Sequence, residues 1–145
     1  METRGRQNSE VNCRWSLALG LVVLLASVSG NAVADWVQVS RSEYATAYAD
    51  PATIRRTGDR VKLWNLFDFK TIRVSKASGK SYMSSKSQNE YDCKEEQSRP
   101  HYFSWHSENM GKGEVVVSSS DVGKWEPVPP GTMNEEIMGW ACGKR

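Results

Sequence analysis

Apolar and polar residues alternate over several short stretches of this chain, which is the pattern of β-strands that bury one face. The longest alternation runs over residues 60–70 (RVKLWNLFDFK), where bulky apolar side chains occur on both sides. It predicts a central strand that is covered on both faces. Shorter strands are predicted at 35–40, 44–49, 81–92, 101–106 and 114–118, the last two as a hairpin around a glycine turn at 111–113.

Two stretches are predicted to lack regular structure. Residues 71–80 have a mixed composition and end in Ser-Gly-Lys, which predicts a loop. Residues 125–131 (WEPVPPG) contain three prolines, and proline lacks a backbone N–H and fixes its own φ. We therefore expect an irregular connection before the last element of the chain.

The last element is predicted to be a helix that begins after Thr132. Thr132 and Glu135 have the spacing of a capping box, in which the hydroxyl accepts from a free backbone N–H and the carboxylate reaches back to the cap residue. Gly143 is a helix stop. An apolar stripe lies between them at helical spacing: Met133, Ile137, Trp140 and Ala141. The pattern predicts an α+β protein with short strands followed by one helix.

The first 34 residues predict a secretory signal peptide. Three arginines give a positive start, an apolar stretch of about 14 residues follows, and the A-V-A at 32–34 predicts cleavage after Ala34. An uncleaved anchor is the alternative, but a spanning helix needs about 20 apolar residues. The mature chain is then one domain, residues 35–145, without a further transmembrane segment. The form of the signal favours export to a bacterial periplasm or outer cell surface.

Cys93 and Cys142 are the cysteines left after removal of the signal peptide, because Cys13 lies within it. In an exported chain, a single disulfide is the expected use of such a pair. It would close a loop of about 50 residues and hold the helix on the sheet. By the chain-entropy relation, this closure stabilises the fold by roughly 4 kcal/mol. A redox-active pair is the alternative, but such cysteines usually lie close together, as in C-x-x-C.

Composition fits one small domain of nearly neutral charge. The chain has 145 residues and a formal net charge of +2, so no overall charge directs it to nucleic acid or a membrane surface. Because large aromatic side chains dominate protein cores, most tryptophans of the mature chain are expected to be buried. These are Trp36, Trp64, Trp105, Trp125 and Trp140.

The sequence contains no pattern of catalytic or cofactor-binding residues. It has no G-x-S-x-G, no H-E-x-x-H and no phosphate-binding loop. The odd separation of His101 and His106 places them on opposite faces of one strand, so they cannot share a metal unless the strand bulges. We therefore predict a non-enzymatic protein with no catalytic residue, no metal site and no cofactor.

One segment carries a local excess of positive charge. Between residues 70 and 86 there are five basic residues and no acid: Lys70, Arg73, Lys76, Lys80 and Lys86. They form a candidate patch for an anionic partner, such as a sulfated glycan, a lipid phosphate or an acidic protein surface. An ordinary solvated loop is the alternative. Acids follow at Glu90, Asp92, Glu95 and Glu96. Nucleic acid is not expected as a partner, because aromatic residues are not interleaved as in a stacking platform.

An ordered set of segments resembles the bacterial surface-adhesin protein E family. The segments are YADPATIRR (48–56), VKLWNLFDFK (61–70), the SSKSQNEYDC run into Cys93, MGKGEVV (110–116) and WEPVPPGTMNEEI ahead of Cys142. The resemblance implies a single antiparallel sheet of about six strands, with the C-terminal helix tied to its concave side by a Cys93–Cys142 disulfide. It also implies a binding function, because the founding member is an outer-surface adhesin that binds host matrix and serum proteins and forms dimers.

Two functional hypotheses follow. The first is an adhesin-like binding domain that recognises a protein or glycan partner at the cell envelope or surface, with homodimers compatible with the resemblance. The second is a periplasmic accessory protein of the envelope, which would bind a strand of another bacterial protein on residues 81–91 or at a free sheet edge. Because one fold supports many functions, the fold alone does not decide between them.

Overall fold

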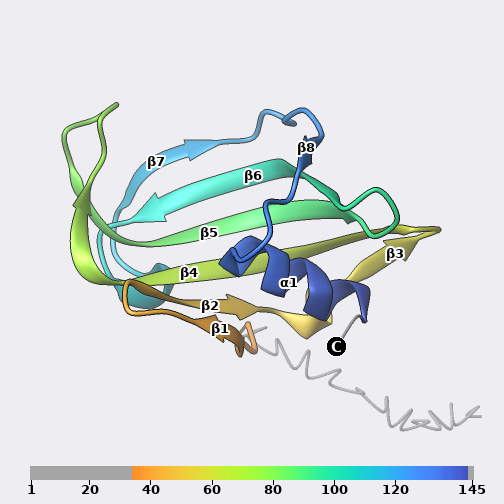
Figure 1. The fold of residues 1–145 in the computed structure, drawn as a ribbon. Coiled ribbons are helices and arrows are strands. Elements are labelled where there is room, and N and C mark those ends of the chain that lie inside the picture. The colour runs from red at the N-terminus through yellow and green to blue at the C-terminus, as the bar shows by residue number, and fades with distance from the viewer. Residues whose placement is uncertain (1–33, 144–145) are drawn as a thin grey trace, which may run out of the picture. The chain divides into compact units, whose positions relative to one another are not determined.

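One antiparallel sheet forms the body of the molecule in the computed structural model, which describes residues 34–143 (Figure 1). The strand order is β1-β2-β4-β5-β6-β7, with β3 paired to β4 and β8 to β6. The strands are β1 (Val37–Arg41), β2 (Ala45–Ala49), β3 (Arg55–Thr57), β4 (Arg60–Val74), β5 (Ser81–Asp92), β6 (Gln97–His106), β7 (Val115–Ser119) and β8 (Glu126–Pro127). One α-helix, α1 (Met133–Cys142), and the short 3-10 helices η1 (Pro51–Thr53) and η2 (Asn109–Gly111) complete the fold. The predicted α+β class is confirmed. The predicted signal peptide, apart from Ala34, lies outside the described residues.

Strand β4 lies at the centre of the sheet, as its alternating pattern predicts. It pairs with β2 and β3 along one edge and with β5 along the other. The strand continues past Lys70, because pairing with β5 resumes after an irregularity, with Arg73 opposite Tyr82 and Val74 opposite Ser81. The loop predicted at 71–80 is therefore wrong for its first part and is restricted to the residues beyond Val74.

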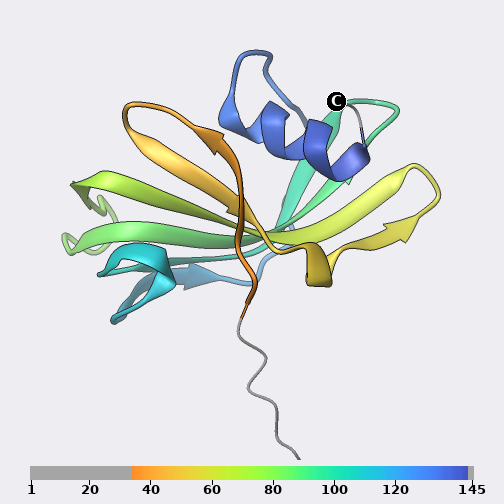
Figure 2. The same cartoon turned by 90° about the horizontal axis from the view of Figure 1, so that it is seen from below.

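The two faces of the sheet have different coverings. Helix α1 packs on one face, which we call the helix face, and the sheet curves around it (Figure 2). Small residues of β2, such as Ala47 and Ala49, allow the helix to approach closely. The remaining buried core residues on this face are Val61, Leu63, Tyr91, Val128, Ile137, Met138 and Ala141. On the opposite face, which we call the outer face, the described residues place no α-helix, and the short 3-10 helix η2 lies against β4 and β5 there (Figure 2).

The expectation that most tryptophans are buried is wrong. Trp36, Trp64, Trp105, Trp125 and Trp140 all keep part of their surface exposed. The physical reason is that α1 covers only part of one face, so the core is filled by alanines, aliphatic residues and Tyr91. Bulky rings elsewhere on the sheet pack against strand neighbours and retain a solvent-facing edge.

Helix α1 begins as predicted but with a modified cap. The hydroxyl of Thr132 accepts a hydrogen bond from the backbone N–H of Glu135 at 3.2 Å. The Glu135 carboxylate accepts from the N–H of Gly131 at 2.7 Å, one residue before the cap to which the capping box assigns it. At the other end, Gly143 adopts φ 75° and ends the helix. Arg56 of β3 donates to the carbonyl of Ala141, so a cation lies at the negative end of the helix.

The predicted disulfide is confirmed. Cys93 directly follows β5, and its bond to Cys142 ties the last residue of α1 to the sheet. Near the other end of the helix, the Tyr91 hydroxyl donates to the side chain of Asn134 at 2.7 Å. The helix is therefore held to the end of β5 by one covalent bond and one buried hydrogen bond. Among the described residues, α1 and the shorter helical turns lack the length and apolar character needed to cross a membrane.

The proline-rich connection before α1 contains one short strand. Glu126 pairs with Ser98 and Pro127 with Gln97, so the expectation of no regular structure is wrong for these two residues. The arrangement is tolerated because β8 borders β6 over only two residues, where a missing proline N–H breaks no long ladder.

The connection between β6 and β7 folds over the outer face. Ser84 donates to the carbonyl of Glu108 at 2.5 Å, and its hydroxyl accepts from the N–H of Gly111 at 2.8 Å. The Asp68 carboxylate accepts from the N–H of Met110 at 2.7 Å. Leu66 is fully buried on this face. Strand β4 is therefore covered on both faces, by α1 on one and by this connection on the other.

Candidate functional site: an aromatic row at the open end of the sheet

A row of aromatic rings crosses the helix face from β6 to β4. We define the aromatic row as Phe103, Trp105, Tyr82 and Phe69, named in their spatial order. Trp105 and Tyr82 stack with ring centroids 4.6 Å apart and planes at 14°. Phe103 lies 5.8 Å from Trp105, and Phe69 meets Tyr82 edge-on at 5.7 Å. Each ring contacts the next, so the four side chains form one continuous surface.

Strand register explains the position of Trp105, and Tyr82, which follows the register irregularity between β4 and β5, joins it through the ring stack. Trp105 pairs with Ser85, and Ser85 pairs with Phe67, whose partner Ala47 belongs to the core under α1. Paired residues share a face, so Trp105 points to the helix face. The helix packs near Val61 and Leu63, and at about 3.3 Å per residue Phe69 lies roughly 20 Å further along β4. The row is therefore beyond the cover of α1, and all four rings are only partly buried.

Several polar groups next to the row have no hydrogen-bond partner among the described residues. Ser85 and Ser87 lie between β4 and β6 on the helix face, opposite Trp105 and Phe103 respectively. Among the described residues, neither hydroxyl makes a hydrogen bond. Ser87 is partly exposed, whereas Ser85 is buried, with 8% of its surface exposed. The Nδ2 of Asn65, opposite Ser87, is fully buried and finds no acceptor within residues 34–143. Because most buried polar groups are satisfied, this end of the face has an unusual surplus of hydrogen-bonding groups.

The basic residues predicted as an anionic-partner patch do not all lie together in the structure. Arg73, Lys76 and Lys80 are exposed on the β4–β5 hairpin, which projects beyond the rest of the sheet (Figure 1). Arg73 lies over the ring of Phe69, 4.2 Å from its centroid, and so extends the aromatic row. Lys86 pairs with Leu66 and Ser104 and points to the outer face. The structure therefore brings three of the five cations together and separates Lys86 from them.

Some of these basic side chains form ion pairs or hydrogen bonds within the protein. Lys80 forms an ion pair with Glu114 of the β6–β7 connection at 2.6 Å, and this pairing holds the pKa of Glu114 below its usual value. Lys70 is exposed and donates to the carbonyl of Ser42 at 2.5 Å. Lys76 has no ion pair or hydrogen bond within the described residues. The binding role of the patch remains a prediction.

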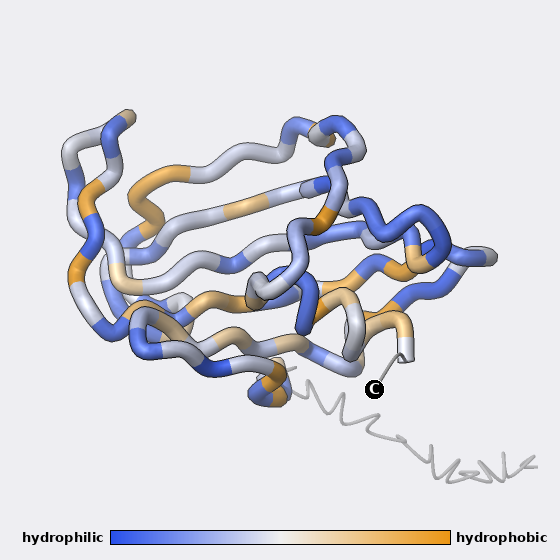
Figure 3. Tube along the Cα trace, viewed as in Figure 1, coloured by the Kyte–Doolittle hydropathy of each residue, from blue (hydrophilic) through white to orange (hydrophobic). Residues whose placement is uncertain are grey.

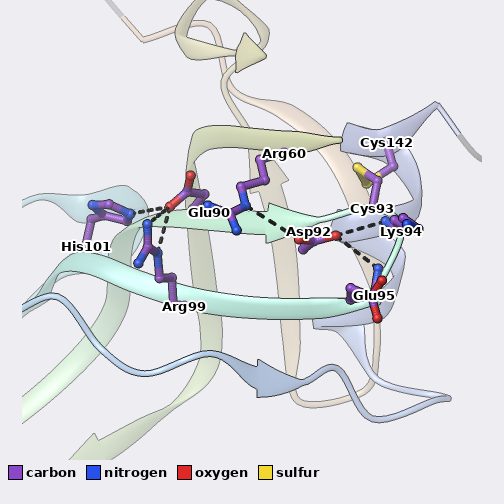
Figure 4. A network of polar contacts seen from close by, with 9 residues as sticks. All are labelled: Arg60, Glu90, Asp92, Cys93, Lys94, Glu95, Arg99, His101 and Cys142. Atoms are coloured by element: carbon purple, nitrogen blue, oxygen red, sulfur yellow. Dashed lines mark hydrogen bonds and ion pairs between the residues drawn. A yellow bond between two sulfur atoms is a disulfide. The ribbon is translucent and has the colours of Figure 1, made fainter. Parts of the chain in front are cut away.

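A separate network of charges lies on the outer face (Figure 4). The Glu90 carboxylate lies 2.7 Å from Arg99 and 2.8 Å from the Nε2 of His101. Burial opposes ionisation of Glu90, but the contacts with His101 and Arg99 outweigh it and hold its pKa below the usual value. Trp125 lies under the guanidinium groups of Arg60 and Arg99. These partners satisfy one another, so the network has a structural explanation.

Turn formation accounts for the acids that follow. Asp92 accepts from the backbone N–H groups of Glu95 and Lys94, and it also contacts Arg60 (Figure 4). The hydrogen bond from Glu95 is the main cause that holds the pKa of Asp92 below its usual value. The Asp92 carboxylate therefore closes the β5–β6 turn beside the disulfide.

The prediction that the two histidines lie on opposite faces is wrong. The β5–β6 register skips His101, since Asn89 pairs with Pro100 and Gln88 with Tyr102. This bulge turns His101 toward Glu90 on the outer face, where His106 also lies, opposite Ser84. The Nε2 of His106 instead lies 2.9 Å from the Ser104 hydroxyl. Within residues 34–143, no group of histidine, cysteine and acidic side chains is arranged to hold a metal ion.

Sequence reasoning missed the aromatic row, although a signal for it is present. Phe67 and Phe69 are two positions apart, as are Phe103 and Trp105, and this spacing places each pair on one face of its strand. Pairing of β4 and β6 to opposite edges of β5 brings the two pairs to the same face. The local spacing predicts that each pair lies on one face of its own strand. It does not predict that the two pairs lie on the same face of the sheet, because that depends on the strand order.

Together, the fold and the site define a small domain of one sheet and one helix, joined by a disulfide, with an aromatic surface that the helix leaves uncovered. The family model of surface-adhesin protein E matches residues 36–143, and this chain belongs to that family. The resemblance inferred from the sequence is therefore confirmed.

Solved structures show the same fold. Haemophilus influenzae protein E matches with a TM-score of 0.55 and 12% identity, covering 74% of this chain and 83% of that chain. Its crystal form II matches with a TM-score of 0.57 and 12% identity, covering 74% and 87%. At this identity the likeness establishes the fold alone. No curated protein sequence matches this chain.

Proposed function

We propose that this protein is an exported, non-enzymatic binding domain that acts like an adhesin at the cell envelope or surface. The match to the surface-adhesin protein E family over residues 36–143 carries the proposal. An open aromatic face beside a basic hairpin supports it, because aromatic residues and arginine are enriched where proteins contact their partners. The partner on this reading is a protein or glycan, and homodimers are compatible with it.

The Cys93–Cys142 disulfide also supports export. Such bonds form and persist in oxidising compartments and are rare in the reducing cytosol. The predicted signal peptide, with cleavage after Ala34, leads to the same compartment. The covalent chemistry of the domain and its N-terminal sequence therefore agree.

Protease accessibility on intact cells is the test of surface location. Cells producing the protein would be treated with protease before and after permeabilisation of the outer membrane, with a periplasmic protein as the control that must survive on intact cells. We expect digestion of the domain on intact cells. Protection until permeabilisation would instead place it in the periplasm and overturn the surface assignment.

A second candidate function is binding of another envelope protein by strand addition, in which the partner supplies a strand that pairs with a free edge of the sheet. Residues 84–91 cannot accept a partner strand by backbone pairing, because this part of β5 pairs with β4 along one edge and with β6 along the other. Strand β7 is a sheet edge, and Val115 on it is exposed. Figure 3 shows hydrophobic positions on this strand, away from α1. Binding through β7 would change little with added salt, whereas binding through the basic hairpin would weaken.

A further inference from the structure

We infer that the aromatic row and the basic hairpin beside it form one binding site for an acidic oligosaccharide. The inference rests on the proposed binding function and names its ligand class. The shared chemistry of the ligand is a chain of sugar rings that carries carboxylate or sulfate groups. The site consists of the four rings of the row, the hydroxyls of Ser85 and Ser87, and the cations Arg73 and Lys76.

The shape of the row fits a linear ligand. Its rings follow one another across three strands in unbroken contact, from Phe103 on β6 to Phe69 on β4, and Arg73 continues the line. Aromatic rings offer apolar surface that contacts the C–H groups of sugar rings. Because Trp105 and Tyr82 stack on each other, a sugar would contact the outer faces and edges of these two rings. A line of such surface accommodates successive units of one chain.

Polar groups beside the row favour a saccharide over a purely apolar partner. The hydroxyls of Ser85 and Ser87 donate and accept and make no hydrogen bond within the described residues. Ser87 is partly exposed, and Ser85 is buried but its hydroxyl keeps a small accessible area. An apolar partner that covered them would leave them unsatisfied, at a cost in affinity. Sugar hydroxyls can satisfy both.

Charge at the end of the row specifies an acidic ligand. Arg73 is exposed, and its guanidinium donors match a carboxylate or sulfate group. Lys76 is exposed and has no ion pair within the described residues. Lys80 is partly neutralised by Glu114, so Arg73 and Lys76 are the cations most available to a ligand.

The test is calorimetric titration of residues 35–145, with the disulfide intact, using a heparin-derived hexasaccharide as the probe. Two further ligands separate the alternatives: cellohexaose, which is neutral, and a hexaglutamate peptide, which is acidic but not a sugar. We expect binding of the hexasaccharide, little binding of either alternative, and weaker binding when salt is raised. Equal binding of hexaglutamate would show a simple anion patch and overturn the saccharide assignment.

Variants locate the site. Trp105→Leu is expected to weaken hexasaccharide binding by about tenfold or more, as for an aromatic residue at the centre of a contact. Arg73→Gln is expected to weaken it about three- to tenfold through loss of a charge-assisted contact. The matched controls are Trp64→Leu on the outer face, which removes another partly buried tryptophan, and Lys94→Gln, which removes an exposed cation at the opposite end of the sheet.

Folding of every variant is checked by its thermal unfolding midpoint, and Phe103→Leu, which removes another ring of the row, takes the place of Trp105→Leu if that variant fails to fold. Unchanged affinity in the folded ring variant and in Arg73→Gln would overturn the site. Absence of hexasaccharide binding by the unaltered protein would overturn the ligand class. The protease test above is independent of these results, so a surface-exposed protein that does not bind the saccharide keeps the proposed function and loses only this inference.

Discussion

At the scale of single residues, Tyr91 links the strand and helix layers of the molecule. It is the largest fully buried side chain, and its hydroxyl donates to Asn134 at the start of α1. Asn134 in turn donates to Ser98 on β6 at 3.3 Å. Burial raises the pKa of Tyr91 above its usual range, so the hydroxyl stays protonated and keeps its role as donor.

Tyr91→Phe is therefore expected to lower the free energy of unfolding by about 1–3 kcal/mol, because it leaves the Asn134 carbonyl without its donor. Urea unfolding of the two proteins measures the difference. Tyr44→Phe is the matched control, because Tyr44 is 64% exposed and its hydroxyl should contribute little. Equal losses in both variants would contradict the role of the buried hydrogen bond.

His106 is the second residue with an unusual environment. It is buried on the outer face, its Nε2 contacts Ser104, and its Nδ1 has no hydrogen-bond partner in the part of the chain that the structure describes. Burial, followed by the charge of Lys86, lowers the pKa of His106 below its usual value. The unfolded chain therefore takes up a proton at a higher pH than the folded protein. As pH falls below about 6.5, the ordinary pKa of histidine, this group destabilises the fold until the lower folded pKa is reached.

An NMR titration of the His106 ring protons should therefore give a pKa below about 6.5. The direct titration is preferable to a stability profile alone, because Glu90 also contributes to acid sensitivity. The lowered pKa of Glu90 stabilises the fold above the pKa of an unfolded glutamate, and this contribution is lost as pH falls through the folded value. A His106 pKa at or above that of a free histidine would contradict the burial argument.

At the scale of elements, the disulfide is the strongest single constraint on α1. The bond closes a loop of 49 positions, and a loop of this length restricts the unfolded chain strongly. It also holds a ten-residue helix, a length that is marginal in water without tertiary packing.

Cys93→Ser and Cys142→Ser are each expected to lower the free energy of unfolding by about 2–5 kcal/mol. Denaturant unfolding of the oxidised proteins, with and without each substitution, gives the value. The double variant should lose about as much as either single variant, because all three remove the same bond. Additive losses would show that the cysteines stabilise the fold in some other way.

Elements with strong local signals could be predicted from the sequence, and those that depend on pairing could not. The alternation in residues 60–70, the Thr132 cap and the two cysteines each contain their own information, and the structure confirms β4, α1 and the disulfide. Strand β3 and strand β8 have three and two residues. Such segments are strands only because a neighbouring strand pairs with them, and their own sequence is too short to show the periodicity that predicts a strand.

The site shows the same division between local and long-range information. The cations of the 70–86 segment could be found from the sequence, but their separation could not, because the side to which Lys86 points depends on the register of β5. The bulge at His101 reverses an alternation that would otherwise place it opposite to His106. One inserted residue changes the face of every residue beyond it, and the sequence gives no clear sign of the insertion.

At the scale of the whole molecule, the central strands of the sheet have more neighbouring strands than the edge strands. Strands β4 and β5 are bordered by neighbours on both sides, whereas β1 and β7 are the ends of the strand order. Local opening requires fewer broken contacts at the edges.

Amide hydrogen exchange should therefore be slowest in β4 and β5 and fastest in β1 and β7, with α1 slow only while the disulfide is intact. Reduction of the disulfide is expected to speed exchange in α1 more than in β5. Mass spectrometry of peptides from exchanged samples measures both effects. Uniform acceleration across the sheet would show that α1 and the sheet open as a single unit.

The position of α1 has a consequence for how this protein can change over evolution. The helix, the disulfide and the small residues of β2 concentrate the packing at one end of a single face, while the aromatic row occupies the other end. Substitutions in the row disturb few of the contacts on which folding depends, and substitutions under the helix disturb many. The domain thus separates a packed scaffold from a surface on which substitutions are tolerated, so a library randomised at Phe69, Tyr82, Phe103 and Trp105 should yield many folded members with altered binding.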